Sequence, residues 1–200
     1  MKRISSRAKG VTLIELLVTL AVMAILAVIA MPSLRNTIRS NQVATANNAL
    51  LADLSYARTE AVNRGLIVSV CPSQDGLGCS GATTYDKGWI VYSYTPGNAV
   101  ANTPYTGVAT NPLLRYTQTR QGVSIQATDD SANGDVISFN SQGQQLPVKG
   151  AVEMDFVTCY RDGATGTGTS SSSVQGIELA LGVAGGVSTK PWAAGATCTP

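Results

Sequence analysis

Gly10-Val11-Thr12-Leu13-Ile14-Glu15 leads into an apolar run that continues to Met31, and this stretch decides the fold. Between Val11 and Met31 the only ionisable side chain is that of Glu15. At about 1.5 Å of rise per residue, a helix over this run would be roughly 32 Å long, enough to cross the hydrocarbon core of a bilayer. We therefore expect residues 11–31 to form a membrane-spanning helix.

The residues before this run determine its orientation in the membrane. Lys2, Arg3, Arg7 and Lys9 are basic and no acidic residue accompanies them, so residues 1–10 are expected to stay in the cytoplasm. A secretory signal peptide is the alternative, with Val28-Ile29-Ala30 as its cleavage site. However, this run is longer than an ordinary signal, contains a carboxylate, and leads into a further helical pattern after Pro32.

The basic leader that ends in Gly10, followed by Thr-Leu-Ile-Glu-Leu-Leu, resembles the class III signal of type IV pilins and type II secretion pseudopilins. The resemblance implies that a prepilin peptidase cuts between Gly10 and Val11 and methylates the new amino terminus. The family usually begins its mature chain with Phe, and this chain has Val11 there. The resemblance also implies an assembly role for Glu15, which would neutralise the amino terminus of a neighbouring subunit.

Physical chemistry supports this role for Glu15. Two opposite charges that are each costly in an apolar helix bundle become tolerable as a pair. The alternative is that the carboxylate only reaches the cytoplasmic interface and has no further function.

Composition indicates one globular domain with an apolar anchor. The chain has 200 residues, of which 44% are hydrophobic and 13% charged. Removing the leader lowers the count of Lys and Arg from 14 to 10 against 12 Asp and Glu, so the formal charge of the mature chain is about −2. This balance gives no support for a basic surface that binds nucleic acid.

The four cysteines, in a chain that begins with an export-type segment, indicate an oxidising compartment and two disulfides. Three pairings are possible. Positions along the chain favour Cys71 with Cys79 and Cys159 with Cys198. A zinc site is the alternative, but the chain has no C-x-x-C pair.

The helical pattern continues over residues 32–64. Leu50, Leu54, Ala57 and Ala61 form its apolar stripe, widened by Leu51 and Val62, while Asn47 is among the polar residues expected away from the core. Gly65 ends the helix, and residues 65–200 form a β-rich head in the periplasm. The segment 163–176 is expected to be mobile surface. Strands are predicted at 66–71, 89–94, 113–118, 123–128, 136–140, 151–159 and 177–181, most simply as one antiparallel sheet packed on the helix.

This layout resembles the GspH/FimT-like branch of the pilin superfamily. The similar elements are Ala57-Arg58-Thr59-Glu60-Ala61, the Cys71 strand, Gly88-Trp89-Ile90-Val91, and Ile137-Ser138-Phe139 followed by Gly143. The resemblance implies an α+β pilin-like fold, with a long N-terminal helix on an antiparallel β-sheet head. It also implies a minor pilin or pseudopilin that works with other major and minor pilins, a prepilin peptidase and an inner-membrane assembly platform.

The sequence gives little support for catalysis or for metal binding. The chain has no histidine and no hydrolase motif, so we expect neither an enzyme nor a cofactor. Asp129 to Asp135 follow the order of a calcium loop, but the twelfth place is Asn140 where a bidentate Glu is expected, so a polar turn and no metal are predicted.

The interpretation is a structural minor pilin that is incorporated into a type IV pilus or primes its assembly. It is expected in the bacterial inner membrane with one span and a periplasmic C-terminal head, and then in the pilus or pseudopilus. A type II secretion pseudopilin of GspH type, which contacts exported proteins, is the first alternative. A DNA-binding competence pilin is the second, although the Gly-Arg-x-Arg element of some FimT-like proteins is replaced by residues 185–190. Arg115, Arg120, Lys149 and Lys190 are the basic residues that folding could gather into a patch.

Overall fold

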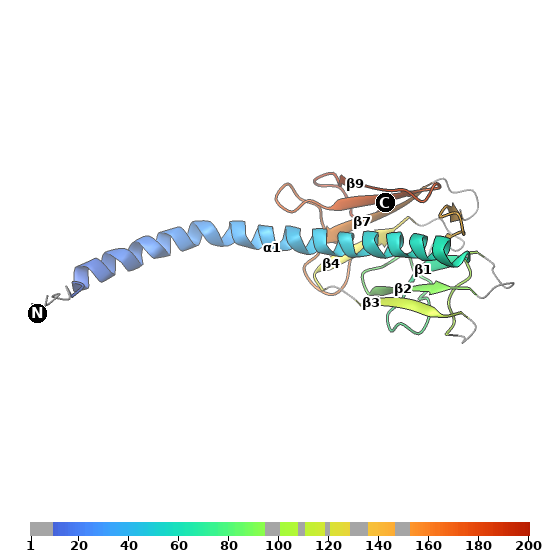
Figure 1. Ribbon diagram of the computed structural model, residues 1–200. Helices are drawn as coiled ribbons and strands as arrows, with labels where there is room; N and C mark the ends of the chain where they lie inside the picture. The colour runs from blue at the N-terminus through green and yellow to red at the C-terminus, as the bar shows by residue number, and fades with distance from the viewer. Residues whose placement is uncertain (1–9, 95–100, 108–110, 119–120, 129–135, 147–152) are drawn as a thin grey trace, which may run out of the picture. The chain divides into compact units, whose positions relative to one another are not determined.

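The structure is a computed structural model that describes residues 10–94, 101–107, 111–118, 121–128, 136–146 and 153–200 (Figure 1). The chain divides into two compact units, Met1–Ile38 and Arg39–Pro200, and the division falls inside the helix. The elements are α1 (Leu13–Arg64), β1 (Val68–Pro72), β2 (Gly88–Ser93), β3 (Leu113–Gln118), β4 (Val123–Ala127), β5 (Ile137–Phe139), β6 (Gln145–Leu146), β7 (Glu153–Tyr160), β8 (Ile177–Gly182) and β9 (Val187–Pro191).

The long helix predicted from the sequence is confirmed, since α1 runs through Pro32 as one assigned element. It ends where the sequence predicts. Gly65 adopts a φ of 65°, and the N–H of Leu66 donates to the carbonyl of Ala61 at 3.3 Å. A glycine in the left-handed region with such a bond is a common helix C-terminus, because it satisfies a carbonyl of the last turn.

In the second unit, the sequence predicts most of the buried residues of the helix correctly. The four stripe residues Leu50, Leu54, Ala57 and Ala61 are fully buried. Val62 is half exposed, contrary to the prediction, and Asn47 is buried although it was placed on the polar face. Asn47 can be buried because its Oδ1 accepts a hydrogen bond of 3.4 Å from the Thr158 hydroxyl of β7.

The head has two antiparallel sheets where the sequence suggested one. The strand orders are β3-β2-β1-β5-β6 and β4-β7-β8-β9, so the α+β class is confirmed and the number of sheets is corrected. Backbone hydrogen bonds also connect the two sheets. Just before β2, the N–H of Tyr85 donates to Ile125 O at 2.9 Å and Thr83 O accepts the N–H of Ala127 at 2.8 Å, around a bridge between Thr84 and Gln126 of β4. The N–H of Gln145 in β6 donates to Val183 O at 3.0 Å. The edge strand β9 was missed because most of its side chains are exposed and polar, and no apolar alternation identifies it.

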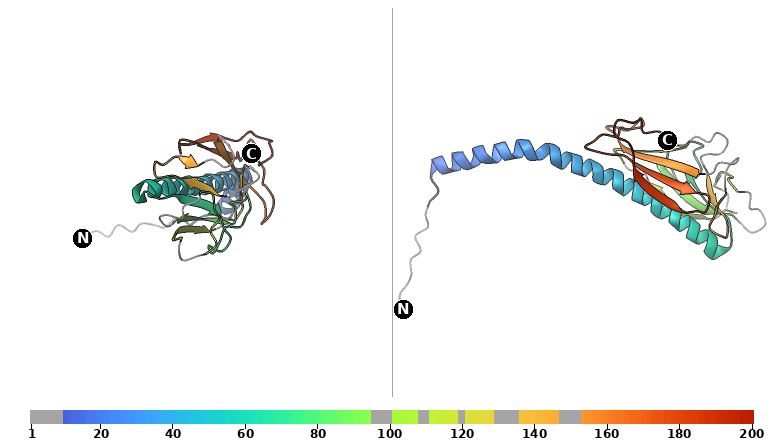
Figure 2. Two further views of the ribbon diagram at one scale, coloured as in Figure 1. Left: turned by 90° about the vertical axis from the view of Figure 1, so that its right-hand side faces the viewer. Right: turned by 90° about the horizontal axis from the view of Figure 1, so that it is seen from above.

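Both sheets and the helix share one hydrophobic core. Figures 1 and 2 show the part of α1 that belongs to the head lying along both sheets. The five-stranded sheet contributes Val68, Val70, Trp89, Val91, Ile137 and Phe139, and the four-stranded sheet contributes Val123, Ile125, Ala127, Met154, Phe156, Leu179 and Leu181. The helix is therefore the element that holds the two sheets to one another.

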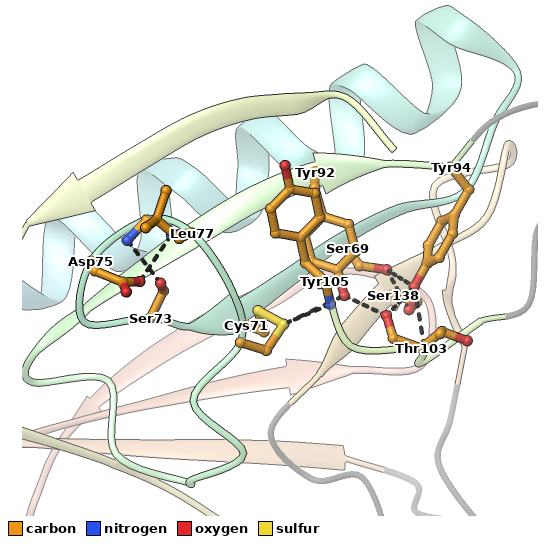
Figure 3. The surroundings of a disulfide bond; sticks show 12 residues. Ser69, Cys71, Ser73, Asp75, Leu77, Tyr92, Tyr94, Thr103, Tyr105 and Ser138 are labelled. Carbon is orange, nitrogen blue, oxygen red and sulfur yellow. Dashed lines mark hydrogen bonds between the residues drawn. A yellow bond between two sulfur atoms is a disulfide. The ribbon is translucent and has the colours of Figure 1, made fainter. Parts of the chain in front are cut away.

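The five-stranded sheet is buried on its other face as well. Cys71, Ile90, Tyr92 and Tyr94 form a second apolar cluster there, and Tyr105 of the segment 101–107 packs against it (Figure 3). The Tyr92 and Tyr94 hydroxyls each donate to Thr103 O at 2.7 Å. Burial raises the pKa of Tyr92, so this phenol stays protonated and remains a hydrogen-bond donor.

The two disulfides of the structure have the pairing that the sequence favours. Cys71–Cys79 closes the loop that covers this second cluster, and the Tyr105 N–H lies 3.0 Å from Cys79 Sγ. Cys159–Cys198 ties the C-terminal tail to β7. Loss of a native disulfide from a small exported domain typically costs about 2–5 kcal/mol.

The segment 163–176, expected to be mobile surface, divides into two parts. Residues 163–167 are exposed, as expected of a surface segment. Ser170 and Val174 are buried, and Ser170 O accepts the N–H of Gly195 at 2.8 Å. The second part is therefore packed against the C-terminal tail, which the composition of the segment did not indicate.

A buried carboxylate joins α1 to the five-stranded sheet. Asp53 is only 4% exposed and accepts three hydrogen bonds. Trp89 Nε1 lies 2.8 Å and Thr117 Oγ1 2.6 Å from Oδ2, and Arg115 Nη1 lies 2.6 Å from Oδ1. The Arg115 guanidinium also stacks 4.0 Å above the ring of Tyr56. These contacts fix the helix against β2 and β3, because each donor has its partner at one position along α1.

We expect Asp53→Ala to destabilise the head by about 2–4 kcal/mol, because it leaves a buried indole N–H unpaired and removes an ion pair. Unfolding of the detergent-solubilised full chain, followed by tryptophan fluorescence, measures this loss. The matched control is Asp162→Ala, which removes the exposed partner of Arg39 and should cost about 0–1 kcal/mol. Equal losses for the two variants would contradict the assignment.

Two glycines allow a pair of turns to meet beneath α1. Gly143, in the turn between β5 and β6, and Gly185, in the turn between β8 and β9, have φ values of 75° and 74°. A Cβ on Gly185 would overlap the carbonyl oxygen of Gly143 and approach Arg58 Nε to 3.1 Å. Arg58 Nη2 in turn donates to Ala184 O at 3.3 Å. The helix and both sheets therefore come together at this point.

Gly185→Ala should destabilise the head by about 2 kcal/mol or more, since it adds a steric overlap to an unfavourable backbone conformation. Gly186→Ala is the control: its Cβ would meet no atom within 4 Å, so a change of less than about 0.5 kcal/mol is expected. Unfolding followed by tryptophan fluorescence measures both stabilities, and a Gly185→Ala variant as stable as Gly186→Ala would contradict the prediction.

Candidate functional site

The predicted cleavage bond lies just before the start of α1. Gly10, Val11 and Thr12 are exposed and outside the helix, which begins at Leu13. The Thr12 hydroxyl accepts the N–H of Glu15 at 3.3 Å, and Thr12 O accepts the N–H of Leu16 at 3.2 Å. Thr12 is therefore the N-cap of α1. This role of Thr12 was not predicted from the sequence, although Thr12 and Glu15 fit the Thr-x-x-Glu spacing typical of a capping box.

The N-terminal part of α1 has an uncovered apolar surface. By length and composition, α1 is the one helix among the described residues that could cross a membrane. All of its large apolar side chains from Leu13 to Met31 are exposed within the chain, and the described residues include no ion-pair partner for Glu15. Side chains of this kind need contacts that the described residues do not supply, either with lipid or with the helices of other subunits.

The basic residues of the head are largely paired with carboxylates. Arg115 binds Asp53, and Lys190 Nζ lies 2.7 Å from Glu178 Oε1. The hydrogen bond to Glu178 raises the pKa of Lys190. The pKa of Asp155 is also raised, mainly by burial and to a smaller extent by the nearby charge of Glu178. Further ion pairs in the described part of the chain include Arg39–Asp162, Arg64–Glu60 and Arg161–Asp86.

These pairs bear on the possible basic patch. Arg115 and Lys190 each already neutralise a carboxylate, so phosphate would have to compete for them. Arg120 and Lys149 lie outside the described residues.

The described part of the chain offers little for metal binding or catalysis. The described residues include no group of three or more His, Cys, Asp or Glu side chains that could hold a metal ion. Asp129 to Asp135, the calcium-like sequence, lie outside the described residues. A cavity of about 460 Å³ lies beside Arg161, and its described lining (Lys87, Gln121, Gly122, Arg161, Gly163 and Ala164) contains no nucleophile paired with a general base.

Solved structures with a similar fold are pilin-like proteins. The type IV minor pilin FimU of Pseudomonas aeruginosa (strain PAO1) matches with a TM-score of 0.51 and 20% identity, over 79% of this chain and 96% of that chain. A second crystal form of FimU has a TM-score of 0.49 and 20% identity, over 77% of this chain and 98% of that chain. The minor pseudopilin EpsH of the Vibrio cholerae type 2 secretion system has a TM-score of 0.47 and 9% identity, over 75% of this chain and 97% of that chain.

At these identities, the first FimU match shows a shared fold and nothing more. No curated protein sequence matches the chain significantly.

Two family models match the sequence. The prokaryotic N-terminal methylation motif matches residues 5–31, which include the leader end, Thr12 and Glu15. The model described as type II transport protein GspH matches residues 46–176, well over half of the chain. The chain therefore belongs to the GspH family and is a minor pilin or pseudopilin, anchored to the membrane by its apolar N-terminal helix.

Proposed function

We propose that this chain is a minor subunit of a type IV pilus, incorporated into the filament or priming its assembly. A prepilin peptidase removes residues 1–10, and the mature chain begins with a methylated Val11. The observation that carries the proposal is the uncovered apolar surface of α1, which lies within the match to the methylation motif. That surface can contact lipid before assembly and the helices of neighbouring major and minor pilins afterwards.

Apolar contact alone does not drive the helix from the bilayer into a filament. Lipid tails are as apolar as the side chains of a helix bundle, so this exchange yields little hydrophobic free energy. Charges in the apolar segment are different, because an unpaired charge costs on the order of 2–3 kcal/mol or more there. Pairing Glu15 with a neighbour's amino terminus gives assembly a favourable term that the bilayer lacks.

The geometry at the helix start makes this pairing reasonable. Glu15 lies in the first turn of α1, where a carboxylate interacts favourably with the positive end of the helix dipole. After cleavage, the amino group of Val11 would lie next to the same positive end, which is unfavourable for a cation. A carboxylate from a neighbouring subunit would relieve this repulsion, and an inner-membrane assembly platform could bring the two subunits together.

We expect Glu15→Ala to leave membrane insertion intact and to reduce recovery in sheared filaments by about tenfold or more, since the penalty of an unpaired amino terminus appears only on assembly. Immunoblots of membrane and sheared fractions measure the two steps, and the mass of the wild-type subunit should correspond to an N-methylated Val11. Glu15→Asp, which keeps the charge, is the control. Equal recovery of wild type and Glu15→Ala would contradict the proposal.

A type II secretion pseudopilus is the second candidate, favoured by the description of the matched family as a type II transport protein. In that case the chain would work with other pseudopilins and contact exported proteins. Deletion of the gene separates the candidates. Loss of a pilus subunit should lower the number of surface pili and leave enzyme secretion unchanged. Loss of a pseudopilin should reduce enzyme secretion and leave the pili unchanged. Counting pili by electron microscopy and assaying secreted enzymes in the same strain measures both, and normal pili with lost secretion would reject the first candidate.

A further inference from the structure

We propose that the Thr12 hydroxyl, by capping α1, keeps the Gly10–Val11 peptide bond outside the helix and available to the prepilin peptidase. Thr12 would thus be a positioning residue for processing, acting through the backbone and not on the reacting atoms. This inference rests on the proposed cleavage after Gly10.

The argument begins with the N–H groups of the first helical turn. An α-helix leaves its first N–H groups without partners inside the helix, because the carbonyls four residues earlier lie outside it. In this chain the hydroxyl of Thr12 accepts the N–H of Glu15 at 3.3 Å. The first bond of the regular helical type is the one from the N–H of Leu16 to Thr12 O, at 3.2 Å. The side chain of Thr12 therefore does the work that the carbonyl of Val11 would otherwise do.

Without this hydroxyl, the cheapest replacement partners are backbone carbonyls. In an apolar environment an unpaired N–H is costly, so the helix gains by extending toward its N-terminus. Extension lets the Val11 carbonyl accept the N–H of Glu15 and the Gly10 carbonyl accept the N–H of Ile14, the regular pattern of an α-helix. The carbonyl of Gly10 is the one that the peptidase must attack.

Hydrolysis adds water across the Gly10–Val11 bond, giving a carboxyl group on Gly10 and an amino group on Val11. A carbonyl that is hydrogen-bonded inside a helical turn has one lone pair occupied and is packed among the neighbouring backbone, so it is less accessible to a peptidase. Gly10 itself opposes helix extension, because glycine is a poor helix former. A Cβ at Gly10 would meet no atom within 4 Å, so no contact in the chain requires glycine there. Gly10 and the Thr12 cap thus both oppose extension of the helix over the Gly10–Val11 bond.

The cap also matters after the cut. Thr12 becomes the second residue of the mature chain and still accepts the N–H of Glu15, so the new amino group lies one residue outside the capped helix. There it is accessible to methylation and to a neighbouring carboxylate. One hydroxyl therefore serves both the precursor and the mature subunit.

The test is cleavage of the full-length precursor in detergent by a purified prepilin peptidase, with the rate followed by mass spectrometry. Thr12→Val has nearly the same shape and lacks the hydroxyl, and we expect it to be cut more slowly, up to the roughly 2- to 30-fold that loss of an N-cap can contribute. Thr12→Ser keeps the hydroxyl and should be cut at close to the wild-type rate. Thr19→Val, which removes a hydroxyl bonded to Leu16 O inside the helix, should also match wild type.

A second measurement reports the arrangement itself. Backbone NMR shifts of Gly10 and Val11 should be extended in wild type and in Thr12→Ser, and should move toward helical values in Thr12→Val. Wild-type cleavage of Thr12→Val would overturn the inference, as would slow cleavage with unchanged shifts, which would mean that the peptidase reads the hydroxyl directly. If wild type is not cut after Gly10, the proposed processing fails, which is a different result from failure of the cap.

Discussion

The hydrogen bonds to Asp53 are the interaction on which the head depends most directly. The helix must pack against two sheets at once, and apolar side chains alone permit it to slide, because one aliphatic contact resembles the next. A buried carboxylate does not permit this, since Trp89, Thr117 and Arg115 donate to it from fixed positions in β2 and β3. Any shift along the helix would leave a buried charge without partners, which costs more than lost apolar contact.

Once the helix is fixed, the two sheets can be joined mainly through it. Their strands do not form one continuous sheet, and only a few backbone hydrogen bonds connect them in the described residues: two around Thr84 and β4, and one between Gln145 and Val183. The shared core under α1 supplies the rest of the contact. Arg58 and the paired turns at Gly143 and Gly185 then secure the end of the helix, where both sheets lie close to it.

The sequence predicted the elements better than their arrangement. The apolar run, the stripe of Leu50, Leu54, Ala57 and Ala61, and the glycine after Arg64 are local patterns, and each of them predicts helical structure or its end without reference to distant residues. The division into two sheets depends on contacts between distant strands, which no single segment encodes. Polar core residues were missed for a related reason: Asn47 and Asp53 are buried only because partners from β7, β2 and β3 reach them. The cap at Thr12 was predictable from its spacing to Glu15, since that signal is local.

The continuity of α1 has a mechanical consequence. Within the head, α1 begins at Arg39, so tension carried by this helix enters the head there and acts along the part of the helix that packs on the sheets. Force in that direction shears the contacts of Leu50, Asp53 and Leu54 together, whereas a perpendicular force would peel them one at a time. The disulfides Cys71–Cys79 and Cys159–Cys198 cross-link strands and loops, and neither includes the helix. Resistance to pulling therefore comes from the packing of the helix around one carboxylate. A reducing agent would loosen the loops of the head before it weakened the contacts between the sheets and the helix.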